Sequence, residues 1–157
     1  MEAGYAVTME GITKRFGPVV ALDNVSLSVR RGTIHALVGE NGAGKTTLMK
    51  ILYGAYPATE GSYSLGDQPK RFRNSAEAIE AGIGMVSQHY SIIGELTCLE
   101  NLMLGAEPGW IIAKPAATNR ANQLAEQMGF SFDWDAEASG LSPAGAQKLE
   151  ILKLLWR

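Results

Sequence analysis

Residues 39–47, with the sequence GENGAGKTT, combine residue types and a spacing that could bind phosphate. They fit the pattern G-x-x-x-x-G-K-[ST], with Gly39, Gly44, Lys45 and Thr46 in the required places. Glycines let the backbone turn so that successive N–H groups face one phosphate, and the lysine reaches the β- and γ-phosphates as a point charge. The hydroxyl of Thr46 is placed to ligate Mg²⁺. The segment therefore predicts a site for a nucleoside triphosphate, without indicating what is done with it.

The chain on either side of this loop is predicted to hold it in place. Residues 33–38 (TIHALV) form a short apolar run typical of a buried strand, and residues 47–52 (TLMKIL) are typical of a helix. That helix would begin with its positive end toward the bound anion. The alternative is a glycine-rich turn with an incidental Lys-Thr pair, but both the spacing and the strand–loop–helix context favour a phosphate-binding loop.

Composition narrows the class of protein. With 157 residues, 46% hydrophobic and 19% charged, the chain is typical of one soluble α/β domain. Its net charge of −2 argues against a nucleic-acid-binding surface. The one basic cluster is KRFR at residues 70–73, which we interpret as a solvated edge beside a turn, with a phosphate-binding patch as the alternative.

The single cysteine, Cys98, rules out a disulfide within the chain and favours a reducing cytoplasm. It stands among leucines, so we expect a small buried apolar residue and not a nucleophile. The sequence begins without a signal-peptide pattern, and no apolar run approaches the ~20 residues of a membrane span. If the protein works at a membrane, we expect it to do so through a partner.

The pattern changes along the chain from strands to helices. Several short strands are predicted before the loop, residues 83–87 (IGMVS) predict a buried strand, and a helical pattern follows from Leu96 onward. In the last predicted helix, Ser142 is a fitting N-cap and Pro143 a fitting first residue. The body of that helix is apolar nearly all round, so we expect it to be buried.

Taken in order, these features resemble the ATP-binding domain of ABC transporters: short strands, the phosphate loop, Gln88 at a strand end, a helical insertion and an L-S-x-x-G-like helix start. The segments GIGMVSQHYSIIGELTCLENLMLG and LSPAGAQKLEILKLLWR look most like the importer ATPases for simple sugars and nucleosides. The resemblance implies an α/β fold of the P-loop NTPase type, in which an antiparallel β subdomain and part of a parallel sheet make up residues 1–89. Residues 90–157 would then form a helical subdomain that ends in the signature helix.

The resemblance also implies roles for three regions. Phe16 sits where the family places an aromatic ring that stacks on adenine, and a core phenylalanine is the alternative. Gln88 matches the glutamine that touches Mg²⁺ or the attacking water, in a loop that contacts the membrane subunit, and an ordinary exposed polar residue is the alternative. Residues 142–147 match the signature that binds the γ-phosphate of ATP held on an opposing subunit.

The signature departs from the family pattern, because Pro143 and Ala144 stand where two small residues, the second usually glycine, are expected. Gly145 could restore flexibility one position later, and a plain capped helix start is the alternative. Lys45 and Gln88 are expected to act in catalysis, and Thr46 and Gln88 to contact the metal. The residues expected to contact ATP are Phe16, Gly39, Asn41, Gly42, Ala43, Gly44, Lys45, Thr46, Thr47, Ser142 and Gly145.

After the signature helix, the family carries a buried strand ending in Asp-Glu (Walker B) and then a switch histidine. Neither occurs here, so we expect a domain truncated before the Walker B strand, which binds nucleotide weakly and hydrolyses it very slowly. The expected ligands are ATP and Mg²⁺. The expected partners are a second ATP-binding domain and a membrane permease, at the cytoplasmic face of the membrane, with no nucleic acid. A soluble ABC-type ATPase acting on nucleic acid or ribosomes, or a non-hydrolysing nucleotide-dependent interaction module, are the alternatives.

Overall fold

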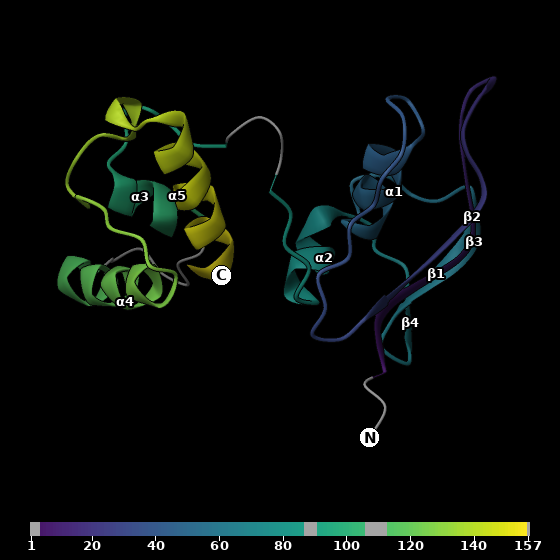
Figure 1. The fold of residues 1–157 in the computed structure, drawn as a ribbon, viewed down its shortest axis with the longest axis horizontal. Coiled ribbons are helices and arrows are strands. Elements are labelled where there is room, and N and C mark those ends of the chain that lie inside the picture. The colour runs from purple at the N-terminus through teal and green to yellow at the C-terminus, as the bar shows by residue number, and fades with distance from the viewer. Residues whose placement is uncertain (1–3, 87–90, 106–112, 157) are drawn as a thin grey trace. The chain divides into compact units, whose positions relative to one another are not determined.

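The structure, a computed structural model, describes residues 4–86, 91–105 and 113–156 (Figure 1). The chain divides into two compact units, Met1–Gly84 and Met85–Arg157. The first unit holds all the strands of the described residues, and the second holds the helices that follow them. Each unit is described by itself below.

The first unit is built on an antiparallel sheet. Its strands are β1 (Tyr5–Phe16), β2 (Val19–Arg30), β3 (Glu60–Leu65) and β4 (Gln68–Lys70), in the order β2-β1-β3-β4. The long β1–β2 hairpin pairs Tyr5 with Arg30 at one end and Phe16 with Val19 at the other, with register shifts between. The region before the phosphate loop, predicted as several short strands, is therefore two long irregular ones.

Two helices accompany this sheet. Helix α1 (Lys45–Leu52) buries Leu48 and Ile51, and helix α2 (Ser75–Glu80) is capped by Asn74, whose side chain accepts from the Glu77 N–H. Apolar side chains on one face of the sheet and on α1 form one core, because each element alone leaves an apolar face in water. The buried members of this core are Met9, Ile12, Leu22, Leu48, Ile51 and Tyr63.

The second unit is helical. It contains α3 (Cys98–Met103), α4 (Lys114–Gln127), the short 3-10 helix η1 (Ala138–Gly140) and α5 (Pro143–Trp156). A capping box at Thr97 starts α3, where the Thr97 hydroxyl accepts from the Glu100 N–H and the Glu100 carboxylate accepts from the Thr97 N–H. Cys98 is fully buried in the core of this unit, as predicted. Its neighbours in that core include Leu99, Leu102, Ala121, Leu149, Leu152 and Trp156.

Helix α5 starts as predicted at Pro143, but its body is not buried all round. Leu155 is 48% exposed, whereas the charged side chains of Glu150 and Lys153 are buried. A helix packed by α3 and α4 on one side leaves its opposite face in solvent, so only part of the apolar surface is covered. The buried charges have bonding partners within the same unit.

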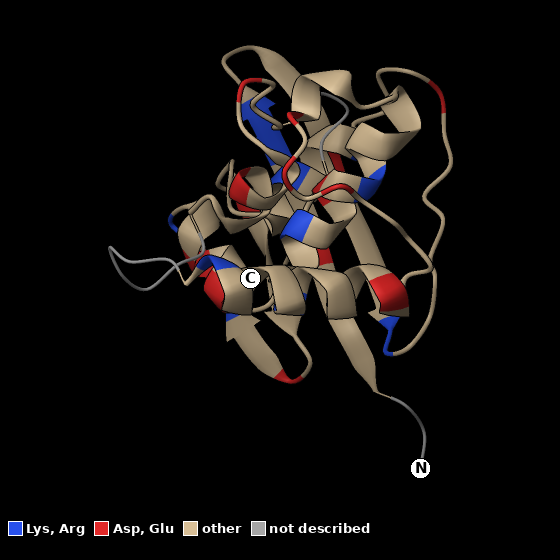
Figure 2. Cartoon of the chain, turned by 90° about the vertical axis from the view of Figure 1, so that its left-hand side faces the viewer, with Lys and Arg blue, Asp and Glu red and all other residues tan. Residues whose placement is uncertain are grey.

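Positions of Lys and Arg and positions of Asp and Glu are interspersed along the ribbon in Figure 2. No large field of one sign gathers in that view. This mixture of signs agrees with the small net charge of −2.

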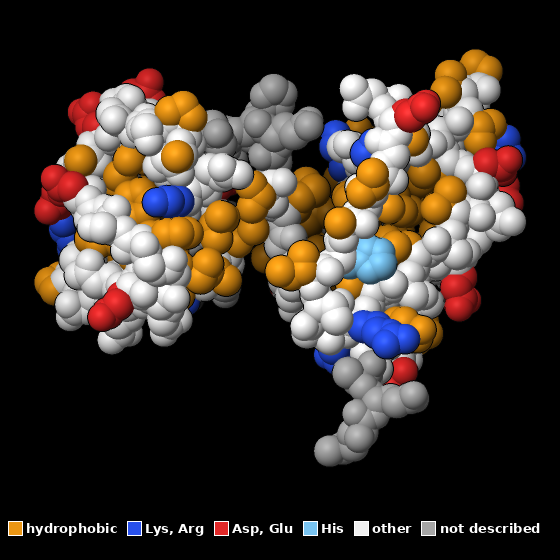
Figure 3. All heavy atoms as spheres, in the orientation of Figure 1, with side chains coloured by type: hydrophobic (Ala, Val, Ile, Leu, Met, Phe, Trp, Pro, Cys, Tyr) orange, Lys and Arg blue, Asp and Glu red, His pale blue; other side chains and the backbone are white. Residues whose placement is uncertain are grey.

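The prediction of a strand at residues 33–38 is wrong, because these residues form no strand in the structure. Ile34 is 103% exposed and Val38 is 89% exposed, and hydrophobic side chains are visible on the surface of this unit in Figure 3. The strand predicted at 83–87 is likewise not formed over 83–86, and residue 87 lies outside the described residues. A strand is defined by hydrogen bonds to a neighbouring strand, and in the described residues neither segment has one, so apolar sequence alone did not suffice.

Candidate functional site

Gly44 joins the phosphate-binding loop to the helix. It is the N-cap of α1 and has a left-handed backbone with φ of 86°. A Cβ at this position would lie 2.6 Å from the Ala21 carbonyl oxygen and 2.6 Å from Cδ2 of Leu22. Only glycine therefore lets α1 begin directly against β2, which places the end of the loop beside the sheet.

Lys45 closes the loop on itself. Its ammonium group donates to the carbonyl oxygens of Gly39 at 2.6 Å and Glu40 at 2.7 Å, so the charge lies beside the backbone that precedes the helix. The first-turn N–H groups of α1 have no acceptor within the helix, and the helix dipole adds partial positive charge there. Together these groups make a cationic, donor-rich end to α1, which is the environment a phosphate needs.

The other loop residues lie at the surface of this unit. Asn41, Gly42 and Ala43 are exposed, and Gly42 has φ of 85° with open space around it. Thr46 is exposed and Thr47 half-buried, so the Thr46 hydroxyl is accessible to a hydrated cation. The structure thus places residues 39–44 in a loop that leads directly into the first turn of α1, which holds Lys45, Thr46 and Thr47. That they contact ATP and Mg²⁺ remains a prediction.

Phe16 lies at the end of β1 and is 42% exposed, so the alternative of a core phenylalanine is wrong. Its ring meets the ring of Tyr56 edge-on, with the centroids 5.4 Å apart and an angle of 79° between the planes. The Lys14 ammonium lies 4.9 Å from the Phe16 ring and donates to the Pro57 carbonyl at 2.7 Å. An exposed aromatic ring held by an aromatic and a cationic neighbour can contact a planar base.

Tyr56 and Lys14 are residues that the sequence reasoning missed. Tyr56 follows α1, whereas Lys14 and Phe16 belong to β1, so no spacing along the chain links them. The only signal in the sequence is an aromatic residue shortly after the helix and before Pro57, a pattern too common to carry a prediction.

Ser142 caps α5 as predicted. Its hydroxyl oxygen accepts from the Gly145 N–H at 3.1 Å, and its carbonyl accepts from the Ala146 N–H at 2.9 Å. The residue is exposed, and a hydroxyl that accepts one bond still has a proton to donate to an anion. A Cβ on Gly145 would lie 3.3 Å from Cδ2 of Leu141, a tight contact on the inner side of the helix start. The capped start is thus formed with Pro143 as the first helical residue, and its contact with a phosphate stays a prediction.

Gln88 lies outside the described residues, so the structure does not place it. Ser142 belongs to the helical unit and residues 39–47 to the first unit. The predicted boundary between an ATP-binding part at 1–89 and a helical subdomain at 90–157 stays a prediction as a functional division.

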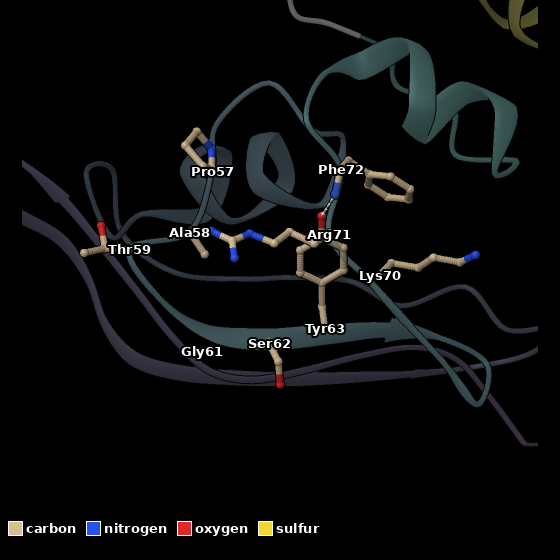
Figure 4. Close-up of a pocket in the computed structure, with 9 residues that line it drawn as sticks. All are labelled: Pro57, Ala58, Thr59, Gly61, Ser62, Tyr63, Lys70, Arg71 and Phe72. Atoms are coloured by element: carbon tan, nitrogen blue, oxygen red, sulfur yellow. Dashed lines mark hydrogen bonds between the residues drawn. The ribbon is translucent and has the colours of Figure 1, made fainter.

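A surface pocket of about 310 Å³ lies beside the basic segment of the first unit (Figure 4). Tyr63 forms part of its wall, and its hydroxyl accepts from the Phe72 N–H at 2.9 Å. The side chains of Lys70 and Arg71 extend in opposite directions in Figure 4. Since two cations that diverge cannot clamp one phosphate, we interpret this segment as a solvated edge.

Within 4–86, 91–105 and 113–156, no group of three or more His, Cys, Asp or Glu side chains could hold a metal ion. Over the same ranges, no helix has the length and apolar character needed to cross a bilayer. That Thr46 and Gln88 contact a metal stays a prediction.

Sugar import ATP-binding proteins are among the known proteins of similar sequence. The chain is 46% identical over 152 residues to the ribose import ATP-binding protein RbsA 1 of Burkholderia thailandensis, a match that covers 95% of this chain and 30% of that protein. It is 43% identical over 155 residues to the xylose import ATP-binding protein XylG of Geobacillus kaustophilus, which covers 96% of this chain and 31% of that protein. The chain thus spans less than a third of the length of these relatives.

Solved structures of similar fold are ATP-binding cassettes. The ADP conformation of such a cassette from an ABC transporter matches with a TM-score of 0.85 and 30% identity, covering 97% of this chain and 65% of that chain. A nucleotide-free cassette matches with a TM-score of 0.82 and 29% identity over the same shares. Both support the predicted fold class, whose antiparallel sheet and helices are present here.

The family model described as ABC transporter matches residues 22–157, from within β2 through the phosphate loop to α5. This match covers most of the chain and confirms the resemblance drawn from the motifs. The chain belongs to the ABC transporter family.

Proposed function

We propose that this chain is the ATP-binding part of an ABC importer, in which ATP binding and hydrolysis drive uptake of a solute through a membrane permease. The observation that carries the proposal is the loop at residues 39–47, with Lys45 folded over it and Gly44 setting the start of α1. The relatives named for ribose and xylose import support a sugar as the class of solute.

In the proposed site, each residue has a physical task. The loop N–H groups and Lys45 hold the β- and γ-phosphates. When ATP binds, the Lys45 ammonium donates to phosphate oxygens in place of the carbonyls of Gly39 and Glu40. The hydroxyl of Thr46 would hold Mg²⁺, which neutralises charge on the phosphates. Phe16 contacts the adenine ring, and its neighbour Tyr56 limits the orientations available to it.

The proposed complete site takes its remaining walls from elsewhere. Ser142 and the first turn of α5 would face the γ-phosphate of ATP on a second ATP-binding domain, and Gln88 would orient the attacking water or touch Mg²⁺. No Asp-Glu pair occurs in the sequence, and a carboxylate that polarises water supplies much of the hydrolytic rate in this class of reaction. We therefore expect these 157 residues alone to turn over ATP very slowly.

The affinity for MgATP tests the site directly. Lys45→Ala removes the ammonium from the loop, and we expect the affinity to fall about 10-fold to 150-fold, as for loss of a charged hydrogen bond of roughly 1.5–3 kcal/mol. Lys70→Ala is the matched control, because Lys70 is a cation of the same unit in the basic segment. An affinity lost in Lys70→Ala and retained in Lys45→Ala would move the phosphate site to the basic segment and refute the proposal.

Turnover and partners are tested separately. A chimaera that continues after Arg157 with the following residues of the ribose import relative should hydrolyse ATP at least tenfold faster than the chain alone. Co-purification with a membrane permease would support a peripheral position at the cytoplasmic face. Co-purification with ribosomes or nucleic acid would favour a soluble ABC-type ATPase instead, which the interspersed charges of Figure 2 do not support.

A further inference from the structure

Three polar side chains are buried inside the described helical unit, and all three bond to the same stretch of backbone. Asn101 is 0% exposed, Glu150 5% and Lys153 7%. Their partners lie in residues 91–97, the segment that leads from the region of Gln88 into α3. Buried polar groups that converge on one segment indicate that its position is specified.

Ser91 is bound to α5 through each of its polar groups. Its backbone N–H donates to Oε1 of Glu150 at 2.5 Å, and its hydroxyl donates to the same oxygen at 2.9 Å. Its carbonyl accepts from the Lys153 ammonium at 3.0 Å. Glu150 and Lys153 are one helical turn apart, so they hold the residue from both sides along one face of α5.

Asn101 of α3 fixes the next part of the segment. Its side-chain oxygen accepts from the Ile93 N–H at 2.8 Å, and its side-chain nitrogen donates to the Ile93 carbonyl at 2.8 Å. The same nitrogen also lies within bonding distance of the carbonyls of Leu96 and Thr97. The segment is thus tied to α5 at Ser91 and to α3 at Ile93.

Stability alone does not account for this arrangement. Desolvating a carboxylate and an ammonium costs several kcal/mol each in general, and an apolar pair of similar volume is often as stable or more so. What charged and amide side chains add is direction, since they bond only when donor and acceptor are aligned. The buried polar groups therefore serve to set the position of Ser91 and Ile93 relative to the helices.

We propose that Glu150 and Lys153 are positioning residues that lock Ser91 to the helix that begins at Ser142, with Asn101 fixing the segment behind it. Residues 142 and 150 lie on one continuous helix, about 12 Å apart at 1.5 Å per residue. Ser91 follows Gln88 by three positions in the sequence, so α5 holds the chain three residues after Gln88. The role of this link in catalysis rests on the proposed function, in which Ser142 and Gln88 both act on ATP. The contacts of Ser91 with α5 do not depend on that function.

The test uses the 157-residue chain without nucleotide, so that it is independent of whether ATP binds. Amide hydrogen exchange is measured by NMR in the original protein, in Glu150→Ala and in the control Glu126→Ala, which removes an exposed carboxylate from α4. We expect the Ser91 amide to exchange at least tenfold faster in Glu150→Ala, with α4 amides changing less than twofold. Glu150→Gln should restore most of the protection, because its amide oxygen can accept the same bonds.

A second pair of variants keeps the test decisive if Glu150→Ala does not fold. Lys153→Met has an apolar side chain of similar length, and it should move the carbonyl ¹³C resonance of Ser91, whereas Lys148→Met on the exposed part of α5 should not. Unchanged exchange and an unchanged carbonyl resonance at Ser91 would overturn the proposal. The proposal would also be overturned if the α4 amides exchanged faster by the same factor as the Ser91 amide, because that result would indicate general loss of the core.

Discussion

Replacing Gly44 with alanine tests whether the phosphate loop is held against the sheet as the structure shows. Gly44 and Gly42 have nearly the same backbone, with φ of 86° and 85°. A Cβ on Gly44 would lie 2.6 Å from the Ala21 carbonyl oxygen, whereas a Cβ on Gly42 meets nothing within 4 Å. The two substitutions therefore share the conformational cost and differ in the steric one.

The magnitude follows from these two terms. A left-handed backbone costs a residue with a Cβ roughly 1–2 kcal/mol, so Gly42→Ala should destabilise the unit by about that amount. Gly44→Ala adds a clash with backbone that cannot rotate away, worth roughly 1–3 kcal/mol as for overpacking. The difference between the two variants is then about 5-fold to 150-fold in an equilibrium constant.

Hydrogen exchange of the α1 amides is the suitable assay. The three tryptophans, Trp110, Trp134 and Trp156, all belong to the second unit, whereas the α1 amides belong to the first. The Leu48 N–H, which donates to the Gly44 carbonyl at 2.9 Å, reports on the first turn of α1. If exchange of the Leu48 N–H were accelerated equally in both variants, or more in Gly42→Ala, that result would show that α1 does not start against β2.

Three further predictions concern the helical unit. Thr97→Ala should lower the free energy of unfolding by about 1 kcal/mol, seen in urea titration by Trp fluorescence, because α3 loses its cap; no loss would mean that the capping box contributes nothing. Hydrogen bonds from the Thr97 N–H and hydroxyl lower the pKa of Glu100 in the folded protein. The ionised Glu100 side chain therefore stabilises the fold at pH values above its pKa in the unfolded chain, about 4.3, and this stabilisation is lost as the pH falls through the lower folded pKa. Glu100→Gln should flatten acid denaturation in that window, and an identical pH profile would contradict this. Burial, and secondarily the charge of Asp133, raises the pKa of the Cys98 thiol, so it should react with a thiol reagent at pH 8 far more slowly in the folded protein than in urea; equal rates would show that Cys98 is accessible.

The local parts of the site could be predicted from the sequence because their physics is local. The turn at Gly44 and the cap at Ser142 depend on backbone angles and on hydrogen bonds between residues three or four apart. Residue types at that spacing determine both, and the structure forms both. The family could be predicted from the same motifs, because their order along the chain can be read without any knowledge of the packing.

Long-range pairing was decided only by the tertiary structure. The run at 33–38 is apolar enough for a strand, yet it forms none, because a strand needs a partner that composition does not supply. The ring of Tyr56 beside Phe16 joins segments on either side of the phosphate loop. Glu150 and Lys153 look like solvent residues in a helix, yet both are buried and bond to Ser91, which lies 59 and 62 positions earlier. The sequence by itself determines which hydrogen bonds residues close together in the chain can make. Hydrogen bonds between distant segments form only when the fold brings those segments together.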